Sequence, residues 1–281
     1  MEMERWEPLG GGAGVWMSAE HRFGEDALLL ARFSLPPAPP PASPVSPAPP
    51  ASSSSFSSPS SPASPALSSP RKAAGERPAA APSPVRLAAD LGTGCGILPV
   101  LWCRDNPCLR VEALEIQPEA AELARRSAAD SGFSDRIRVH TADLRRWREW
   151  LEPASMDLVA VNPPYFPPQS GGVPAEEAVR IARHENTDPA RPGCSLRDAA
   201  AAAAGLLRSG GRFCLCHRPE RLTDALTILR EAGLEPKRLR FVHRNPGDAP
   251  WLFLCEGRRG GRPGLTLEPP SIQVPCCFGN I

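Results

Sequence analysis

The sequence predicts a doubly wound α/β fold, built on a mostly parallel sheet of about seven strands. From Val85 onward, short apolar runs alternate with longer amphipathic segments, which is the pattern of strands joined by helices. A glycine-rich turn follows the first of these runs, and an Asn-Pro-Pro sequence ends the fourth. Ligands of such open sheets bind at the carboxyl ends of the strands, so both motifs lie where a site is expected.

The elements follow from apolar runs and their end signals. The expected strands are 85–91, 110–114, 136–140, 156–161, 212–216, 236–243 and 251–256. The expected helices are 97–104, 118–131, 220–232 and an alanine-rich one that starts at Ser195 and ends at Gly210-Gly211. Proline at position 118 suits the first turn of a helix. Ser195 and Asp198 have the spacing of a capping box, which fixes the start of the alanine-rich helix.

The chain is expected to divide into four parts. Residues 1–34 form an N-terminal segment whose apolar helix, 27–33, packs on the main body and follows two acids that suit a helix start. Residues 35–84 consist mainly of Pro, Ser and Ala and cannot bury enough apolar surface to offset ordering, so disorder is predicted. A polyproline segment that binds a partner is the alternative. Residues 85–270 form the main domain, and 271–281 are a tail of unknown order.

Composition narrows the class of protein. The net charge is +1, which requires no polyanionic partner. The nine cysteines are scattered, and the closest groups, Cys214-x-Cys216 and Cys276-Cys277, match neither a zinc nor a redox spacing. No run of eighteen apolar residues occurs, and the acidic, glycine-rich start is unlike a secretory signal. We therefore expect a cytoplasmic protein without a metal site or a membrane segment.

The stretch from Asn162 to Phe166 suggests chemistry on a planar amine. It follows the predicted strand 156–161 and contains the chain's only tyrosine. The amide oxygen of Asn162 and the carbonyl of Pro163 could each accept one N–H of an exocyclic amino group, which would turn its lone pair toward an electrophile. Pro163 and Pro164 hold the backbone still, because proline fixes φ and has no N–H. Tyr165 could stack on a base, although a simple strand-ending turn is the structural alternative.

The turn from Asp90 to Gly96 is the expected cofactor end. Its glycines, Gly92, Gly94 and Gly96, allow a sharp turn and close approach of a ligand. The following helix lacks the third glycine of dinucleotide sites, so a pyrophosphate ligand is less favoured. Glu115 closes the second strand and can accept both ribose hydroxyls, whereas Asp143 could accept from an adenine amino group. Each acid could instead be a solvated loop residue.

These motifs resemble those of class I S-adenosylmethionine-dependent methyltransferases with an NPPY motif. The stretches 23–31, 182–185 and 257–270 are similar to the tRNA1(Val) adenine-N6 methyltransferase family. The resemblance implies a Rossmann-like methyltransferase fold, S-adenosyl-L-methionine as cofactor, and an adenine beside the anticodon of tRNA as target. It also implies two sets of residues. The cofactor would contact Asp90, Gly92, Thr93, Gly94, Gly96, Glu115 and Asp143, and the target amine would meet Asn162, Pro163, Pro164 and Tyr165.

The substrate is less well defined by the sequence. Residues 208–262 carry 12 Arg and Lys against 6 Asp and Glu, which fits phosphate contacts or an ordinary solvated surface. Phe166, Arg183 and His184 are candidates to contact the substrate, and His184 with Glu185 could close over the base or bond to each other.

The alternative functions are a protein glutamine methyltransferase, another nucleic-acid amino methyltransferase for rRNA or DNA, and a binding module without turnover. We disfavour the glutamine enzyme because its relatives carry a helical domain before the sheet, where this chain has about 34 residues.

Overall fold

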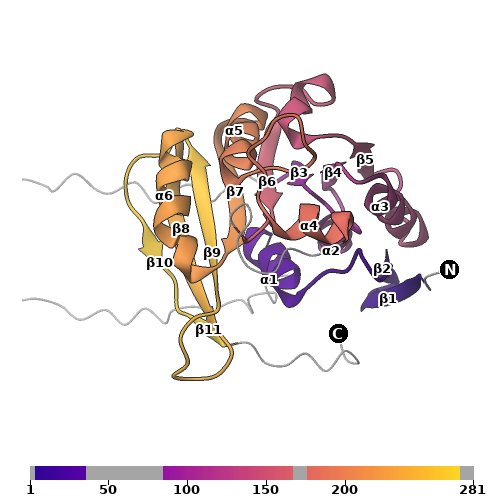
Figure 1. The fold of residues 1–281 in the computed structure, drawn as a ribbon, viewed down its shortest axis with the longest axis horizontal. Coiled ribbons are helices and arrows are strands. Elements are labelled where there is room, and N and C mark those ends of the chain that lie inside the picture. The colour runs from indigo at the N-terminus through magenta and orange to yellow at the C-terminus, as the bar shows by residue number, and fades with distance from the viewer. Residues whose placement is uncertain (1–3, 36–84, 167–175, 273–281) are drawn as a thin grey trace, which may run out of the picture. The chain divides into compact units, whose positions relative to one another are not determined.

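The computed structural model describes residues 4–35, 85–166 and 176–272. A central sheet has helices on both faces (Figure 1). Its main strands are β3 (Leu87–Leu91), β4 (Arg110–Glu115), β5 (Ile137–Thr141), β6 (Met156–Val161), β7 (Leu207–His217), β8 (Leu234–His243) and β9 (Leu252–Arg259). Across the sheet they are ordered β8-β9-β7-β6-β3-β4-β5. β9 runs antiparallel to β7 and β8, and the other neighbours are parallel, which confirms the expected fold class.

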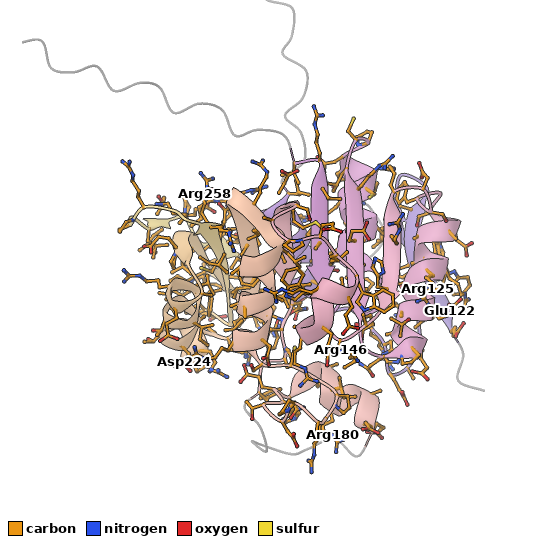
Figure 2. All side chains as sticks on the ribbon, turned by 90° about the horizontal axis from the view of Figure 1, so that it is seen from above. Glu122, Arg125, Arg146, Arg180, Asp224 and Arg258 are labelled. Carbon is orange, nitrogen blue, oxygen red and sulfur yellow. The ribbon has the colours of Figure 1, made fainter. Side chains whose placement is uncertain are left out.

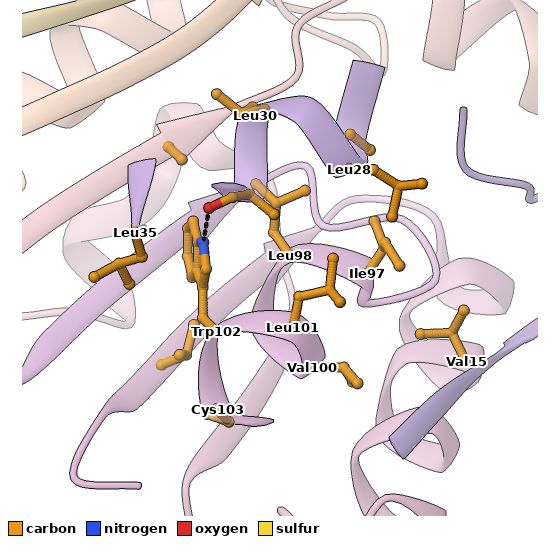
Figure 3. Close-up of a cluster of buried hydrophobic side chains, with 14 of the residues drawn as sticks. Val15, Leu28, Leu30, Leu35, Ile97, Leu98, Val100, Leu101, Trp102 and Cys103 are labelled. Atoms are coloured by element: carbon orange, nitrogen blue, oxygen red, sulfur yellow. Dashed lines mark hydrogen bonds between the residues drawn. The ribbon is translucent and has the colours of Figure 1, made fainter. Parts of the chain in front are cut away.

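The sheet is buried on both faces. The helices are α1 (Glu25–Ser34), α2 (Ile97–Asp105), α3 (Pro118–Asp130), α4 (Glu177–Arg183), α5 (Leu196–Leu206) and α6 (Leu222–Glu231), with short 3₁₀ turns η1 (Leu144–Glu149) and η2 (Pro219–Arg221). Ala88 and Leu158 share a core with α1, α2 and α3, part of which Figure 3 shows. Ala89 and Val159 belong to the opposite core, with α5 and α6. Because successive residues of a strand face opposite ways, each central strand feeds both cores.

The order of the strands brings the two sequence motifs together. β3 lies between β4 and β6, and its last residue, Leu91, pairs with Leu114 on one side and Val161 on the other. All three strands are parallel, so their carboxyl ends lie at one edge of the sheet. The glycine turn, Glu115 and Asn162 therefore emerge side by side, although they are distant in sequence.

The alanine-rich helix is shorter than the sequence predicted. The capping box is confirmed: Ser195 accepts from the Asp198 N–H while the Asp198 carboxylate accepts from the Ser195 N–H. The helix ends at Leu206, however, and β7 begins at once. Gly210 and Gly211 lie within β7, at an irregularity of its pairing with β6, and Gly210 has φ +76°. These glycines serve a bulge in the strand, so their interpretation as a helix end was wrong.

A β-hairpin at the N-terminus was not predicted. Strands β1 (Arg5–Gly10) and β2 (Ala13–Met17) pair antiparallel through a glycine-rich turn. The hairpin packs on α3: Ser131, the C-cap of this helix, and Ser127 accept from the N–H groups of Gly14 and Trp16 at 3.0 and 2.8 Å. Serines in a helix gave no sign of this pairing, since side-chain contacts so far apart in sequence leave no periodic pattern.

Smaller differences concern the ends of elements. The expected strand 85–91 begins at Leu87, and the expected helix 220–232 is divided into η2 and α6. Two strands of two residues, β10 (Thr266–Leu267) and β11 (Ser271–Ile272), pair with β8 and are too short to show a pattern. Of the expected disordered part, 35–84, Leu35 is the buried C-cap of α1, and residues 36–84 lie outside the described residues, as do 273–281 of the tail. Within the described parts of the chain, no helix is both long and apolar enough to cross a membrane.

Candidate active site

A cavity of about 760 Å³ opens at the carboxyl ends of β3, β4 and β6. This size is in the range of small-molecule sites. The cavity is lined by most of the residues that the sequence singled out: Asp90, Gly92, Thr93, Gly94, Glu115, Asp143, Asn162, Pro163, Pro164, Tyr165, Phe166 and Arg183. Gly96 and His184 are absent from this lining. One concave space thus contains both the glycine turn and the Asn-Pro-Pro-Tyr stretch.

The glycine turn leaves room for a ligand against the backbone. Gly92 and Gly94 have φ of +75° and +55°, and no atom lies within 4 Å of the position that a Cβ would take. The turn is fixed by bonds from the N–H groups of Gly92 and Thr93 to the Leu114 carbonyl, at 2.8 and 3.0 Å. A side chain at either glycine would be strained and would project into open space where a ligand could lie.

Gly96 has a different reason to be glycine. It is the N-cap of α2 with φ +88°, and a Cβ there would come within 3.2 Å of the backbone and Cβ of Ala124. The close packing of α2 on α3 therefore requires glycine at this position. Its expected contact with a cofactor finds no support in the lining of the cavity.

Two buried carboxylates lie beside the glycine turn, Gly92 to Gly96, which we call the glycine end of the cavity. Asp90 is 2% exposed and accepts from the Thr93 hydroxyl at 2.7 Å, and burial raises its pKa to about 7. Glu115 is also buried, which raises its pKa. Its two oxygens accept one backbone N–H each, from Gly94 at 2.8 Å and Gln117 at 3.0 Å. Since a carboxylate oxygen has a second acceptor position, Glu115 can also bind two hydroxyls of a ligand.

Asp143 lies at the same cavity but is engaged with the protein. It caps η1 by accepting from the Arg145 N–H at 2.9 Å. The Arg145 guanidinium forms a fork with both oxygens, the shortest contact being 2.5 Å, and also donates to the carbonyls of Asp188 and Arg191. Asp143 therefore has fewer free acceptor positions than Glu115. A ligand amino group would have to share its carboxylate with Arg145.

The other end of the cavity, where the sequence predicts that the target amine binds, contains a hydrogen-bond network around Asn162. We call it the amine end. Its amide nitrogen donates to Asp26 at 3.2 Å, and the Tyr165 hydroxyl lies 2.5 Å from the same Asp26 oxygen. The Asn162 oxygen lies 2.7 Å from the Tyr165 hydroxyl and 3.1 Å from the Cys216 sulfur. Burial is the main cause that raises the pKa of Tyr165 well above its ordinary value, so the phenol keeps its proton. Its ring packs on the imidazole of His217, with centroids 5.3 Å apart.

Phe166 forms the exposed rim of the cavity. It pairs with His184 in an isolated parallel bridge, and the two rings lie 5.4 Å apart between centroids. Phe166 is 44% exposed, whereas His184 is buried behind it. Helix α4 ends at this bridge and projects from the molecule, with Arg180 pointing outward (Figure 2). The exposed aromatic ring is therefore Phe166, not Tyr165.

Glu185 bonds to residues of α5 and η2. It accepts from the Leu196 N–H at 3.1 Å and from the Arg221 guanidinium at 3.3 Å. Of the two alternatives for His184 and Glu185, a bond between them is not among the side-chain contacts of the described residues, and closure over a base stays a prediction. These contacts join the chain after α4 to the start of α5 and to η2, so Glu185 holds the rim in place.

The sequence missed two residues of the network. Asp26 was interpreted as an acid that suits a helix start, within the family-like stretch 23–31 but without a role in the site, and Cys216 as one of several scattered cysteines. Cys216 could have been placed from the sheet order, because β7 lies beside β6 and ends next to Asn162. Asp26 lies on α1, and no pattern in the sequence links this helix to the end of β6. In the described part of the chain, no group of three His, Cys, Asp or Glu could hold a metal ion.

Comparisons with known proteins agree with the fold. Residues 80–182 match the family of the methyltransferase small domain. A predicted O-methyltransferase from Agrobacterium tumefaciens has the same fold, with a TM-score of 0.51 and 25% identity over 66% of this chain and 79% of that protein. The fold is thus the Rossmann-like methyltransferase fold that the sequence predicted.

Curated relatives of this chain have names that state a substrate. A tRNA1(Val) (adenine(37)-N6)-methyltransferase from Porphyromonas gingivalis is 33% identical over 171 residues, which are 60% of this chain and 64% of the relative. The protein of that name from Yersinia pestis is 28% identical over 186 residues, 65% of this chain and 64% of the relative. The chain matches slightly less than two thirds of the length of these relatives. The resemblance indicated by the motifs is confirmed.

Proposed function

We propose that this protein transfers a methyl group from S-adenosyl-L-methionine to the N6 amino group of an adenine in RNA, and that the RNA is a tRNA modified beside its anticodon. One observation carries the proposal. The acceptor pair after β6 and the glycine turn with Glu115 line a single cavity, so a methyl donor and an amine could meet there. The names of the curated relatives support this substrate.

The glycine end fits the proposed cofactor. The space over Gly92 and Gly94 suits a ligand close to the backbone, and the spare acceptor positions of Glu115 suit the two ribose hydroxyls. Asp90 lies just before the same turn, and Asp143 also lines the cavity, where it could accept from the adenine amino group of the cofactor. When bound, the cofactor supplies a methyl group made electrophilic by its sulfonium.

The amine end fits an exocyclic NH₂. The Asn162 oxygen and the Pro163 carbonyl accept its two N–H groups, and the nitrogen lone pair then points toward the methyl donor. No base is needed before attack, because the amine becomes acidic only once it is alkylated. His217, behind Tyr165, stays neutral at physiological pH because burial lowers its pKa to about 4. The protein contributes placement, which is worth on the order of 7–11 kcal/mol in well-oriented reactions.

Aromatic rings offer contacts for the target base. Tyr165 lines the inner wall, and Phe166 lies at the opening of the cavity. Stacking on such rings is worth about 1–3 kcal/mol per base, which offsets much of the cost of removing a base from its stack. Buried His184 supports the Phe166 ring from behind. We propose Tyr165 for the target adenine and Phe166 for the same base or its neighbour.

Arginines around the opening suit an RNA backbone. Arg22 and Arg183 both line the cavity and are exposed. Each can pair with a phosphate oxygen, and the basic excess of residues 208–262 adds to this potential. With tRNA as the substrate, we propose that the enzyme acts in the cytoplasm.

The test is transfer of a radiolabelled methyl group to two acceptors, unmodified tRNA transcripts and a translation release factor. We expect label in tRNA, and N6-methyladenosine in the nucleosides of that tRNA by mass spectrometry. Label in the release factor alone would support a glutamine methyltransferase instead. Absence of label in both acceptors, despite calorimetric binding of S-adenosyl-L-methionine, would point to a module without turnover.

A further inference from the structure

Asp26 contacts the two side chains that the proposed reaction depends on most. It is the second residue of α1, and one carboxylate oxygen lies near both the Asn162 amide nitrogen and the Tyr165 hydroxyl, at 3.2 and 2.5 Å. The other oxygen accepts from the Ala27 N–H at 2.9 Å. Asp26 also lines the cavity. This carboxylate therefore belongs to the site although it comes from a different part of the chain.

The carboxylate is held in place by a rigid support. Leu30 and Phe33 of α1 are buried, and the indole of Trp102 on α2 donates to the Ala31 carbonyl at 3.2 Å (Figure 3). Gly24 precedes the helix, and a Cβ at that position would come within 2.5 Å of an Asp26 oxygen. The glycine thus leaves room for the carboxylate to turn toward its own helix and β6.

The protons of the network can be assigned from chemistry. A carboxylate accepts only, so the atom of Asn162 that faces Asp26 must be its NH₂ group, and the amide oxygen must face the other way. The Tyr165 hydroxyl has a single proton and three acceptors in reach: Asp26, the Asn162 oxygen and, at 3.3 Å, the Cys216 sulfur, which is the weakest acceptor of the three. A bond to a charged acceptor is about twice as strong as one to a neutral acceptor, so this proton goes to Asp26.

This assignment leaves an acceptor position on Asn162 for the substrate. The Cys216 thiol can donate to the Asn162 oxygen at 3.1 Å and occupies one lone pair as a weak donor. The second lone pair stays available for an N–H of the amine. Without Asp26, the Tyr165 proton would turn to the Asn162 oxygen, 2.7 Å away, and occupy that position. The amide would also be free to flip.

We propose that Asp26 is a positioning residue, which fixes the orientation of the Asn162 amide and draws the Tyr165 proton away from the Asn162 oxygen. The inference rests on the proposed function where it concerns turnover. It does not require Asp26 to act as a base, because its proposed effect is on the Asn162 amide and the Tyr165 proton. Its distinctive consequence is that removing the Tyr165 hydroxyl should restore part of the kcat that Asp26→Ala loses.

The kinetic test uses Asp26→Ala, Tyr165→Phe and the double variant, at saturating cofactor. Asp26→Ala should lower kcat about 10- to 100-fold, as misplaced catalytic groups do, and leave KM for the cofactor within about twofold. The double variant should recover severalfold over Asp26→Ala, because it lacks the competing hydroxyl. Glu25→Gln removes the same charge from the same helix turn, lies outside the cavity lining and should keep the kcat of the wild type.

Three results would overturn the inference. They are a kcat of Asp26→Ala within about twofold of wild type, a double variant no faster than Asp26→Ala, and an equal loss in Glu25→Gln. Thermal melting of each variant separates these results from unfolding. A structural role alone would lower the melting temperature without producing recovery in the double variant.

A second measurement is independent of turnover. In protein labelled with ¹⁵N-asparagine, the side-chain NH₂ signals of Asn162 are those missing from Asn162→Ala. We expect one of them to be shifted and slow to exchange in the wild type, and to lose both properties in Asp26→Ala. Unchanged Asn162 signals in Asp26→Ala would refute the contact between Asp26 and the Asn162 amide. If the wild type methylates no acceptor, the proposed function fails and these signals alone decide the role of Asp26.

Discussion

The two ends of the cavity are built in different ways. The glycine end is local: its backbone turn and Glu115 lie on neighbouring strands, and each Glu115 oxygen is held by a nearby N–H. The amine end is assembled from side chains of α1, of the segment after β6 and of β7, which are far apart in the sequence. We infer that binding of the cofactor depends on backbone shape and one carboxylate, whereas turnover depends on a side-chain network. Variants at the two ends should therefore affect different constants.

The largest effect is expected for Asn162→Ala. It removes one of the two acceptors that orient the amine, and removal of a comparable polar group from an active site costs about 10²- to 10³-fold in kcat. Affinity for S-adenosyl-L-methionine should stay within severalfold of wild type, because the glycine end is unchanged. Single-turnover rates and calorimetry measure the two quantities. Retained turnover would remove Asn162 from the mechanism.

Glu115→Ala should show the opposite behaviour. The variant loses the two proposed hydrogen bonds from the ribose hydroxyls to the carboxylate. This should weaken cofactor affinity about 10- to 100-fold, while kcat at saturating cofactor changes much less. Glu119→Ala, on the exposed first turn of α3, is the matched control and should leave affinity unchanged. Equal calorimetric affinities for Glu115→Ala and wild type would show that the ribose assignment is wrong.

Asp90 should make stability depend on pH. Its pKa rises from 3.8 to about 7 because the carboxyl is buried, so between these values the folded state holds a proton that the unfolded state has lost. The contribution of Asp90 to stability is therefore full below pH 3.8 and is lost as the pH rises to about 7, by at most about 1.4 kcal/mol per pH unit. Urea unfolding of the ligand-free protein should show this fall, and Asp90→Asn should flatten it. An equal slope in both proteins would contradict the assignment.

Two glycines in the same turn separate packing from binding. Gly96→Ala forces a Cβ against Ala124 at positive φ and should destabilise the fold by about 1–3 kcal/mol, with little change in affinity for the cofactor. Gly92→Ala meets no atom within 4 Å and should mainly weaken the binding of the cofactor. Thermal melting and calorimetry of both variants check this difference. The same loss of affinity in both would mean that Gly96 also contacts the ligand.

Much of the fold was predictable because its signals are local. The capping box at Ser195, the strand that ends before Asn162 and the glycine turn each lie within a few residues, and the parallel sheet follows from their alternation. The hairpin before Asp26 and the end of α5 were missed for different reasons. Gly210 has the left-handed conformation of a helix end but serves a strand bulge, and only the pairing of β7 with β6 distinguishes the two.

The candidate site could be predicted only in part, for a similar reason. Glu115 ends β4 and Asn162 follows β6, and the order of the strands alone brings them together. The position of Asp26 depends on how α1 packs on α2. This packing is decided by buried apolar contacts and by the hydrogen bond of the Trp102 indole. Such contacts specify the position of a helix without leaving a motif. The polar residue that the helix carries is then invisible to sequence reasoning.

The most direct test of the central claim is a crystal structure with a bisubstrate analogue, in which the N6 of adenosine is linked to an amine analogue of the cofactor. We predict that N6 lies about 2.7–3.2 Å from both the Asn162 oxygen and the Pro163 carbonyl, with the cofactor ribose on Glu115. An analogue whose ribose sits on Glu115 while its N6 is out of reach of Asn162 would contradict the account.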